Sequence, residues 1–139
     1  NDLISAILKD VSDKHSDVTV DIIGRMPPTL RLDNMDICTI FYNLFDNAFI
    51  AAESSEKKSV RISVRLLGEN LFFLIKNTIP HKIEIVDNIL ITEKDDTRHH
   101  GFGSGNAANC VERNGGELIY KCSDTHFEAE LILPNIDSF

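Results

Sequence analysis

The sequence predicts an α/β fold of two layers, in which a mixed, mainly antiparallel sheet is covered by helices on one face. Two observations lead to this fold class. Apolar residues recur at helical spacing in two segments, and several other segments alternate apolar and polar residues as strands do. The strands mostly follow one another along the chain, which leaves the helices to cover a single face and favours a two-layer sandwich over a doubly wound sheet.

The first half of the chain predicts two amphipathic helices with a strand between them. Both helical stripes place apolar side chains three and four positions apart, and Asp33 or Asn34 can cap the second helix at its amino end. Pro27 and Pro28 mark a turn before that cap. The expected elements are a helix at 2–15, a strand at 18–24, a short extended piece at 30–32 and a helix that ends near Glu53.

The second half predicts two strand pairs separated by an irregular region. Residues 68–70 form a short glycine-containing loop that suits a hairpin. The charged tract at 92–99 lacks any pattern, and we expect it to be a mobile lid when no ligand is bound. The expected elements are strands at 59–67 and 71–77, a short helix at 82–90, a helix after Gly105, and strands at 117–122 and 127–133.

Length and composition limit the classes of function. The 139 residues are expected to form one domain with a single core. The net charge of −8 argues against a nucleic-acid partner, because nucleic-acid binding relies on Lys and Arg. No apolar run approaches the roughly 18 residues of a membrane span, so direct membrane contact is not expected. The cysteines lack a C-x-x-C spacing and are interpreted as reduced core residues of a cytoplasmic domain: Cys38, Cys110 and Cys122.

A glycine-rich run precedes the predicted helix of the second half. Five of the seven glycines fall between Gly101 and Gly116. Glycines at every second position let the backbone approach an anion without Cβ clashes, and the amino end of the following helix attracts negative charge. The run could bind a phosphate chain, although a flexible connection is the commoner explanation of such a run alone. It comprises His100, Gly101, Phe102, Gly103, Ser104, Gly105 and Asn106.

Two asparagines share one face of the second predicted helix. Asn43 and Asn47 lie four residues apart, so their carboxamides point the same way while Leu44 and Ala48 turn toward the core. Taken alone, they are compatible with ordinary solvent-facing positions. Magnesium, however, binds one or two protein oxygens together with the phosphates of a nucleotide, and an acidic domain that binds a nucleotide needs such a cation. Asn47 is the candidate magnesium ligand.

These motifs resemble a known family. Residues 43–48, followed by 51–53, resemble the N-box of the GHKL ATP-binding fold, which sensor histidine kinases share with gyrase and MutL proteins. The glycine run resembles the second glycine box of that fold. The pattern looks most like the histidine kinases related to the quorum-sensing peptide receptors of Gram-positive bacteria. Besides these boxes it includes Asn77, 92–94, His100, Gly101 and 115–118, and it covers about residues 2–134.

The resemblance implies the catalytic and ATP-binding domain of a sensor histidine kinase, which would be part of a longer membrane receptor. It implies that Asn47 binds Mg²⁺ and that ATP lies between this helix and the lid. Asn43 stands where gyrase-like ATPases carry a Glu that activates water, and because an amide is no base, γ-phosphoryl transfer is expected rather than hydrolysis. The acceptor would be a His on a dimerisation domain outside this chain, which would pass the phosphoryl group to a response regulator. The fragment alone would not autophosphorylate.

Several positions depart from that family's pattern. Asn77 stands where an Asp usually reads the adenine; its side-chain oxygen can still accept from the adenine amino group, but more weakly because it is neutral. Ile50 stands where many histidine kinases carry a Lys, and Ser104 replaces a usual Leu. The phosphate charge must then be neutralised by magnesium, by backbone N–H groups, or by side chains of the lid. These side chains are also compatible with ordinary solvated loop positions: Lys94, Arg98, His99 and His100.

Two alternatives stay open at this point. An anti-sigma-type serine kinase of the same fold would phosphorylate a folded partner protein. A degenerate module would keep the fold, lose the nucleotide and act as an interaction surface, which the neutral Asn77 and the apolar Ile50 favour. Asp46 is expected at the surface or behind the metal ligand, not as a base, and His15 is expected in solvent.

Overall fold

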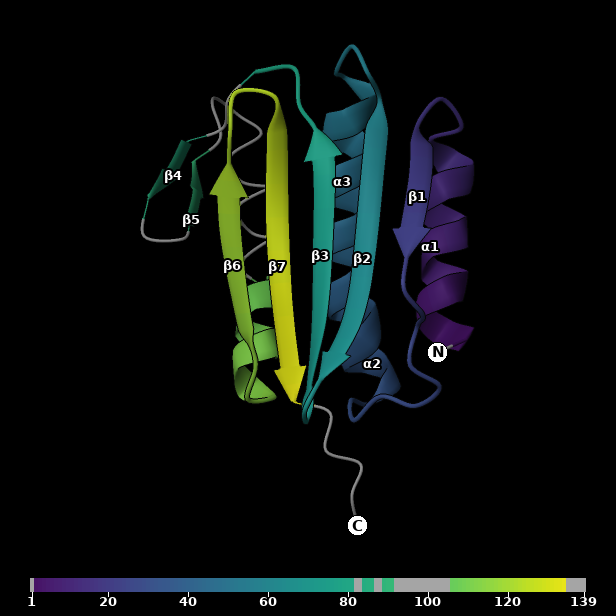
Figure 1. Ribbon diagram of the computed structural model, residues 1–139, viewed down its shortest axis with the longest axis vertical. Helices are drawn as coiled ribbons and strands as arrows, with labels where there is room; N and C mark the ends of the chain where they lie inside the picture. Colours follow the sequence, from purple (N-terminus) through teal and green to yellow (C-terminus); the bar gives the residue numbers. More distant parts are fainter. Residues whose placement is uncertain (1, 82–83, 87–88, 92–105, 135–139) are drawn as a thin grey trace.

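The chain forms two layers, a sheet and a set of helices that pack against one of its faces (Figure 1), as the sequence predicts. This computed structural model describes residues 2–81, 84–86, 89–91 and 106–134. The helices are α1 (Asp2–Lys14), α2 (Asn34–Ile37), the π-helical turn η1 (Cys38–Tyr42), α3 (Asn43–Glu53) and an unlabelled one at residues 106–113, called helix 106–113 below. The strands are β1 (Thr19–Ile23), β2 (Ser59–Leu67), β3 (Asn70–Thr78), β4 (Glu84–Val86), β5 (Ile89–Ile91), β6 (Glu117–Cys122) and β7 (His126–Pro134). No helix within these ranges is long and apolar enough to span a membrane.

The main sheet has the strand order β1-β2-β3-β7-β6. β1 runs parallel to β2, because the helical segment from α2 to α3 crosses between them, and the other pairings in this sheet are antiparallel. The sheet is therefore mixed and mainly antiparallel, which confirms the prediction. The β2–β3 hairpin turns at Gly68 and Glu69, and Gly68 has a φ of 62°, as a two-residue turn with glycine first requires.

The core fills the space between the helices and the sheet. Residues of β2, β3 and β7 alternate, so one face of each strand is buried under the helices. Phe41, Phe45 and Phe49 project from η1 and α3 and are fully buried. The ring of Phe41 meets that of Phe73 in β3 edge to face, with centroids 4.9 Å apart. Because truncating such side chains would leave a cavity, these rings fix α3 and its asparagines against the sheet.

The structure corrects two local expectations and refines a third. The short helix expected at 82–90 is wrong, because β4 and β5 pair antiparallel there and the segment is rich in β-branched residues. The extended piece expected at 30–32 is wrong, because residues 31 and 32 form a bend. The helix that ends near Glu53 is confirmed with Asp33 as its cap, but it contains η1, which apolar periodicity does not reveal.

The cysteines divide between the core and the surface. Cys110 is 1% exposed and belongs to the core, as predicted. Cys38 is exposed, so the prediction of a core residue is wrong there, because Cys38 lies beside the buried stripe of its helix rather than on it. Cys122 is half-buried at the end of β6 and packs against the core.

Candidate functional site

Asparagines from three elements lie on the helix side of the sheet. Asn43 and Asn47 lie on α3, which packs on β2 and β3, while Asn77 lies near the carboxyl end of β3 and Asn106 begins helix 106–113. Asn77 falls on the strand face that the helices cover, because it continues the buried alternation of β3. The predicted lid tract, 92–99, lies outside the described residues. So do the other predicted site residues, which are Lys94, His100, Gly101, Phe102, Gly103, Ser104 and Gly105.

Asn43 stands where the π-turn gives way to α3. Its Nδ2 donates a hydrogen bond to the carbonyl oxygen of Thr39 at 2.7 Å, and its backbone N–H donates to the carbonyl of Ile40. The Thr39 carbonyl, inside the π-turn, thus accepts from a side-chain donor. With Nδ2 engaged in this way, the half-buried Asn43 side chain presents its Oδ1 as an acceptor. A carboxamide here can accept a hydrogen bond or bind a cation, but it cannot act as a base.

Asn47 lies one helical turn beyond Asn43 on the same face and is also half-buried. Its Oδ1 is a hard oxygen of the type that Mg²⁺ prefers, and a magnesium site that is shared with phosphates needs few protein oxygens. In the part of the chain that the structure describes, no cluster of His, Cys, Asp or Glu could hold a metal. Ile50 continues the face and is 37% exposed. The amide oxygens of Asn43 and Asn47 on this face fit a cation that is also bound by a phosphorylated ligand.

Asn77 is only 1% exposed and lies between Val60 and Phe127 in the strand register. Its Nδ2 donates to the carbonyl oxygen of Thr78 at 3.1 Å, which orients the amide and leaves Oδ1 as its acceptor. A buried ring pair borders this position, since the centroids of Phe127 and Tyr120 are 5.6 Å apart. An acceptor beside aromatic rings suits a flat ligand that carries an amino group.

A network of hydroxyl groups lies beside Asn77 and was not predicted from the sequence. Thr78 Oγ1 lies 2.7 Å from Ser55 Oγ and accepts a hydrogen bond from the backbone N–H of Ser59 at 3.0 Å. Ser55 Oγ also donates to the carbonyl of Ala52 at 2.6 Å. These bonds tie the end of α3 to the neighbouring ends of β2 and β3. The available signal was a small polar residue at each of these ends, where such residues bind backbone groups.

His15 is not in solvent, contrary to expectation. Its side chain is 14% exposed, with Nδ1 3.0 Å from Glu53 Oε1 and Nε2 3.9 Å from Asp46 Oδ1. The ring also lies beside that of Phe49, with centroids 6.2 Å apart. The residue therefore links the end of α1 to α3. Asp46 is turned toward the contact between α1 and α3.

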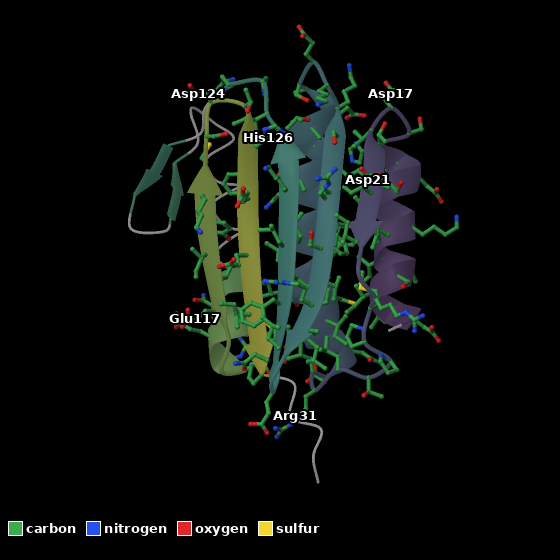
Figure 2. All side chains as sticks on the ribbon, in the orientation of Figure 1. Asp17, Asp21, Arg31, Glu117, Asp124 and His126 are labelled. Carbon is green, nitrogen blue, oxygen red and sulfur yellow. The ribbon has the colours of Figure 1, made fainter. Side chains whose placement is uncertain are left out.

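His126 lies at the Asn77 end of the sheet, opposite Thr78 in the β3–β7 register. Burial lowers the pKa of His126, and the charges of Lys76 and Lys57 lower it further. Figure 2 shows His126 and Arg31 at opposite ends of the molecule.

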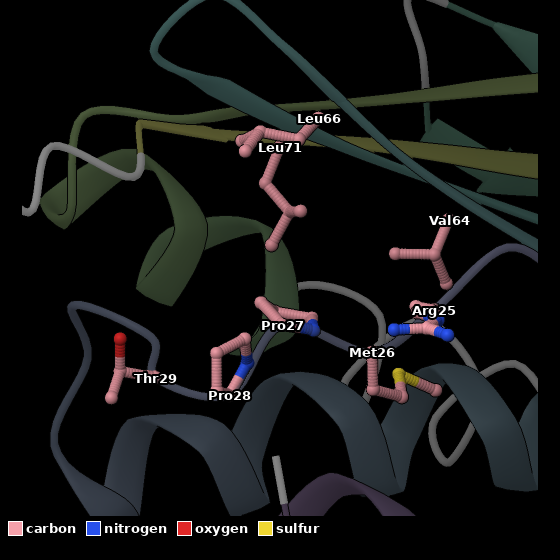
Figure 3. Close-up of a pocket in the computed structure, with 8 residues that line it drawn as sticks. All are labelled: Arg25, Met26, Pro27, Pro28, Thr29, Val64, Leu66 and Leu71. Atoms are coloured by element: carbon pink, nitrogen blue, oxygen red, sulfur yellow. The ribbon is translucent and has the colours of Figure 1, made fainter.

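A pocket of about 650 Å³ lies away from these asparagines, under the β2–β3 hairpin. Leu66 and Leu71 form one wall where the two strands meet, and the loop after β1 forms the other (Figure 3). Since Asn77 stands at the far end of β3, this pocket is separate from the candidate site. Its lining residues are Arg25, Met26, Pro27, Pro28, Thr29, Val64, Leu66 and Leu71.

A family model described as the GHKL domain matches residues 32–134, which is more than half of the chain. This range contains all the asparagines of the candidate site. None of the proteins with a curated description matches the chain.

Several solved structures share the fold. The mycobacterial sensor histidine kinase MprB matches with a TM-score of 0.74 and 16% identity, over 96% of this chain and 94% of that one. The catalytic domain of histidine kinase ThkA matches with a TM-score of 0.74 and 15% identity, over 97% of this chain and 91% of that one. The Acinetobacter baumannii histidine kinase AdeS matches with a TM-score of 0.65 and 17% identity, over 96% of this chain and 65% of that one. At these identities the likeness is one of fold.

Proposed function

Because the chain belongs to the GHKL domain family, we propose that it binds Mg-ATP and transfers the γ-phosphoryl group to a histidine of another domain. The observation that supports this most directly is the placement of Asn43, Asn47 and Asn77 on the helix side of the sheet, within the matched range. We propose ATP as the substrate and Mg²⁺ as its cofactor, held between α3 and the glycine run that leads into helix 106–113.

In this proposal each asparagine has one role. Asn77 accepts a hydrogen bond from the adenine amino group through Oδ1, since its Nδ2 is engaged by Thr78. Asn47 offers an oxygen to magnesium, and the metal neutralises phosphate charge during transfer. Asn43 accepts a hydrogen bond near the phosphates and, being no base, leaves water unactivated. The glycine run, with Asn106 at its end, gives backbone N–H groups to the phosphates.

The rest of the proposal concerns the whole protein. Residues 1–139 would be one GHKL domain of a longer receptor kinase, similar to the quorum-sensing peptide receptors, with this domain in the cytoplasm. The acceptor would be a histidine on the dimerisation domain of that receptor, and a response regulator would take the phosphoryl group from it. Lys94 and His100 would help to neutralise the phosphates. The similarity in fold to solved histidine kinases supports this proposal.

The first test is calorimetric titration of the fragment with a non-hydrolysable ATP analogue, with and without Mg²⁺. We expect magnesium-dependent binding that Asn47→Ala weakens by about tenfold or more, because a ligand of the metal is lost. The matched control is Asn109→Ala, an exposed position on helix 106–113, which should bind like the wild type. No binding by the folded wild type at millimolar nucleotide would contradict the proposal.

A second test identifies the acceptor. In the complete receptor, radioactive phosphate from ATP should appear in a form that acid releases and base does not, as expected for phosphohistidine. An acid-stable ester would favour the serine kinase instead.

The second candidate function is a degenerate module that acts as an interaction surface. The specific observation in its favour is Ile50, an apolar side chain 37% exposed where a phosphate partner would be expected. The absence of nucleotide binding by the folded wild-type chain would support this second function.

A further inference from the structure

Asp36, in α2, contacts the carboxyl end of helix 106–113, far along the chain. We propose that this contact, called the helix clamp and made by Asp36, Cys110, Arg113 and Asn114, sets the spacing of helix 106–113 from α3 and thereby the affinity for nucleotide. Asp36 is then a positioning residue that touches no substrate and acts through the helices that it joins. The inference rests on the proposed function, because nucleotide affinity is the quantity that the clamp controls.

Both carboxylate oxygens of Asp36 take part in the helix clamp. Asn114 Nδ2 donates to Oδ2 at 3.1 Å, and Arg113 Nη2 donates to Oδ1 at 3.4 Å. Asn114 Nδ2 also donates to the Cys110 carbonyl at 2.8 Å, which holds the amide in place. The Cys110 thiol lies 3.9 Å from the Asp36 carbonyl oxygen. The side chain of Asp36 is 19% exposed and that of Arg113 65%, so the carboxylate is shielded while the guanidinium covers it from solvent.

The charge of Asp36 suits this role. The hydrogen bond from Asn114, together with the bond from Cys110, lowers the pKa of Asp36, so the carboxylate stays ionised at neutral pH. Its position in the first turn of α2 and the position of Arg113 in the last turn of helix 106–113 agree with the dipoles of both helices.

The clamp joins helix 106–113 to the uninterrupted helical segment of α2, η1 and α3, and the two run in opposite directions. α3 leads through a short connection into β2, and helix 106–113 leads likewise into β6. β2 and β6 are antiparallel, because three antiparallel pairings separate them. The clamp therefore closes one end of an antiparallel pair of helices, at the hairpin end of the sheet in Figure 1. Asn47 and Asn106 lie away from the clamp along their helices.

The candidate site lies a helix length from the clamp. At 1.5 Å per residue, Asn47 is about 16 Å from Asp36 along its helix, and Asn106 is about 10 Å from Arg113. A tilt about the clamp therefore moves the far ends of the helices more than it moves the clamp itself. Misplacing groups around a substrate by about 1 Å can lower activity by about 100-fold, so the spacing of the helices matters for binding.

Capping of α2 does not require the carboxylate of Asp36. Asp33 caps the helix, because its Oδ1 accepts from the backbone N–H of Asp36 at 2.8 Å. Removing the Asp36 carboxylate leaves this cap in place. The clamp can thus be broken without losing the start of the helix that carries the site.

The test compares nucleotide affinity with stability in matched variants. Asp36→Ala removes both acceptor oxygens, Asn114→Ala removes the donor, and Asp36→Asn keeps an oxygen for Asn114. Titration with Mg²⁺ and the ATP analogue gives Kd, and thermal unfolding gives Tm. We expect each Ala variant to raise Kd about fivefold, the double Ala variant to raise it no further, and Asp36→Asn to stay near the wild type.

The control for stability is Leu71→Ala, which truncates a buried side chain in the pocket of Figure 3 and leaves the clamp residues intact. We expect it to lower Tm and to leave Kd unchanged. If Asp36→Ala lowers Tm while Kd keeps its wild-type value, or if the two Ala variants raise Kd additively, the clamp proposal is wrong. A folded wild-type chain that binds no nucleotide overturns the proposed function as well, and this failure is recognised because it appears before any variant is tested.

Discussion

The two ends of the sheet differ in which side chains they bury: polar residues are buried at one end, and large apolar residues are exposed at the other. At the end where β3 finishes, called the Asn77 end, Asn77 and Thr78 are 1% and 4% exposed and are hydrogen-bonded. At the other end, called the hairpin end, Leu66 and Leu67 are 59% and 49% exposed. Buried polar groups must find partners, so they lower stability wherever the partners are lost. The comparison teaches that hydrogen bonds between buried polar groups stabilise the Asn77 end, whereas backbone geometry and packing stabilise the hairpin end.

The largest effect on stability is expected at Gly24, which follows β1 and lies beside Val64 of β2, on the way to the hairpin end. This residue has a φ of 92°, and a Cβ there would overlap the carbonyl oxygen of Val64. We expect Gly24→Ala to lower the free energy of unfolding by about 3 kcal/mol, measured by urea denaturation. Gly68→Ala is the control, because Gly68 has a φ of 62° but no atom within 4 Å of the added Cβ, and it should lower the free energy by about 1 kcal/mol. Equal losses would show that close backbone approach does not hold this end.

At the Asn77 end, Thr78→Val tests the hydroxyl network. The substitution leaves the N–H of Ser59 without its hydroxyl acceptor and removes one of the partners of Ser55, so we expect the free energy of unfolding to fall by about 2 kcal/mol. Thr29→Val at the hairpin end is exposed and should change it by less than about 0.5 kcal/mol. If the two variants unfold at the same urea concentration, the network contributes nothing to stability.

The asparagines at the two ends of β3 allow a matched comparison of binding. Asn77→Ala removes the buried acceptor, and we expect Kd for the ATP analogue to rise about fivefold through the loss of one hydrogen bond. Asn70→Ala, on the exposed turn, should keep the wild-type Kd. An equal Kd for both variants would mean that Asn77 does not contact the nucleotide.

The smallest effect at neutral pH concerns Cys110 in the helix clamp. Burial raises the pKa of this thiol to about 11 from its ordinary value of 9.0. The unfolded chain therefore loses the proton at lower pH than the folded one, and stability should decline as the pH rises from 9.0 toward about 11. Urea midpoints across this range should decline less in Cys110→Ala. Iodoacetamide at pH 8 should modify the exposed Cys38 and leave Cys110 intact.

The two layers and the β2–β3 hairpin follow from patterns that repeat within a few residues, whereas the strand order was not predicted. The stripe from Ile37 to Phe49 and the alternation in β2 and β3 are strong enough that the helix, the hairpin and the one-sided covering could be predicted. The short elements could not. In residues 82–90 the spacing of apolar residues favours a helix, but the many β-branched side chains favour a strand. The strand forms because β4 and β5 can pair with each other.

The candidate site could be predicted as a set of residues but not as a set of contacts. Asn43, Asn47 and Asn77 stand out by motif, whereas the bond from Asn43 to Thr39 depends on a π-turn that no periodicity shows. The contacts of His15 and of Asp36 join elements far apart in the sequence, so no local pattern could reveal them.

The most direct test of the account locates the bound metal on the molecule. In NMR spectra of the ¹⁵N-labelled fragment with the ATP analogue, Mn²⁺ in place of Mg²⁺ broadens the signals of amides near the metal. The account predicts selective broadening at Asn43 and Asn47, with Gly68 at the hairpin end unchanged. Broadening at the hairpin end, or none that the nucleotide induces, would contradict it.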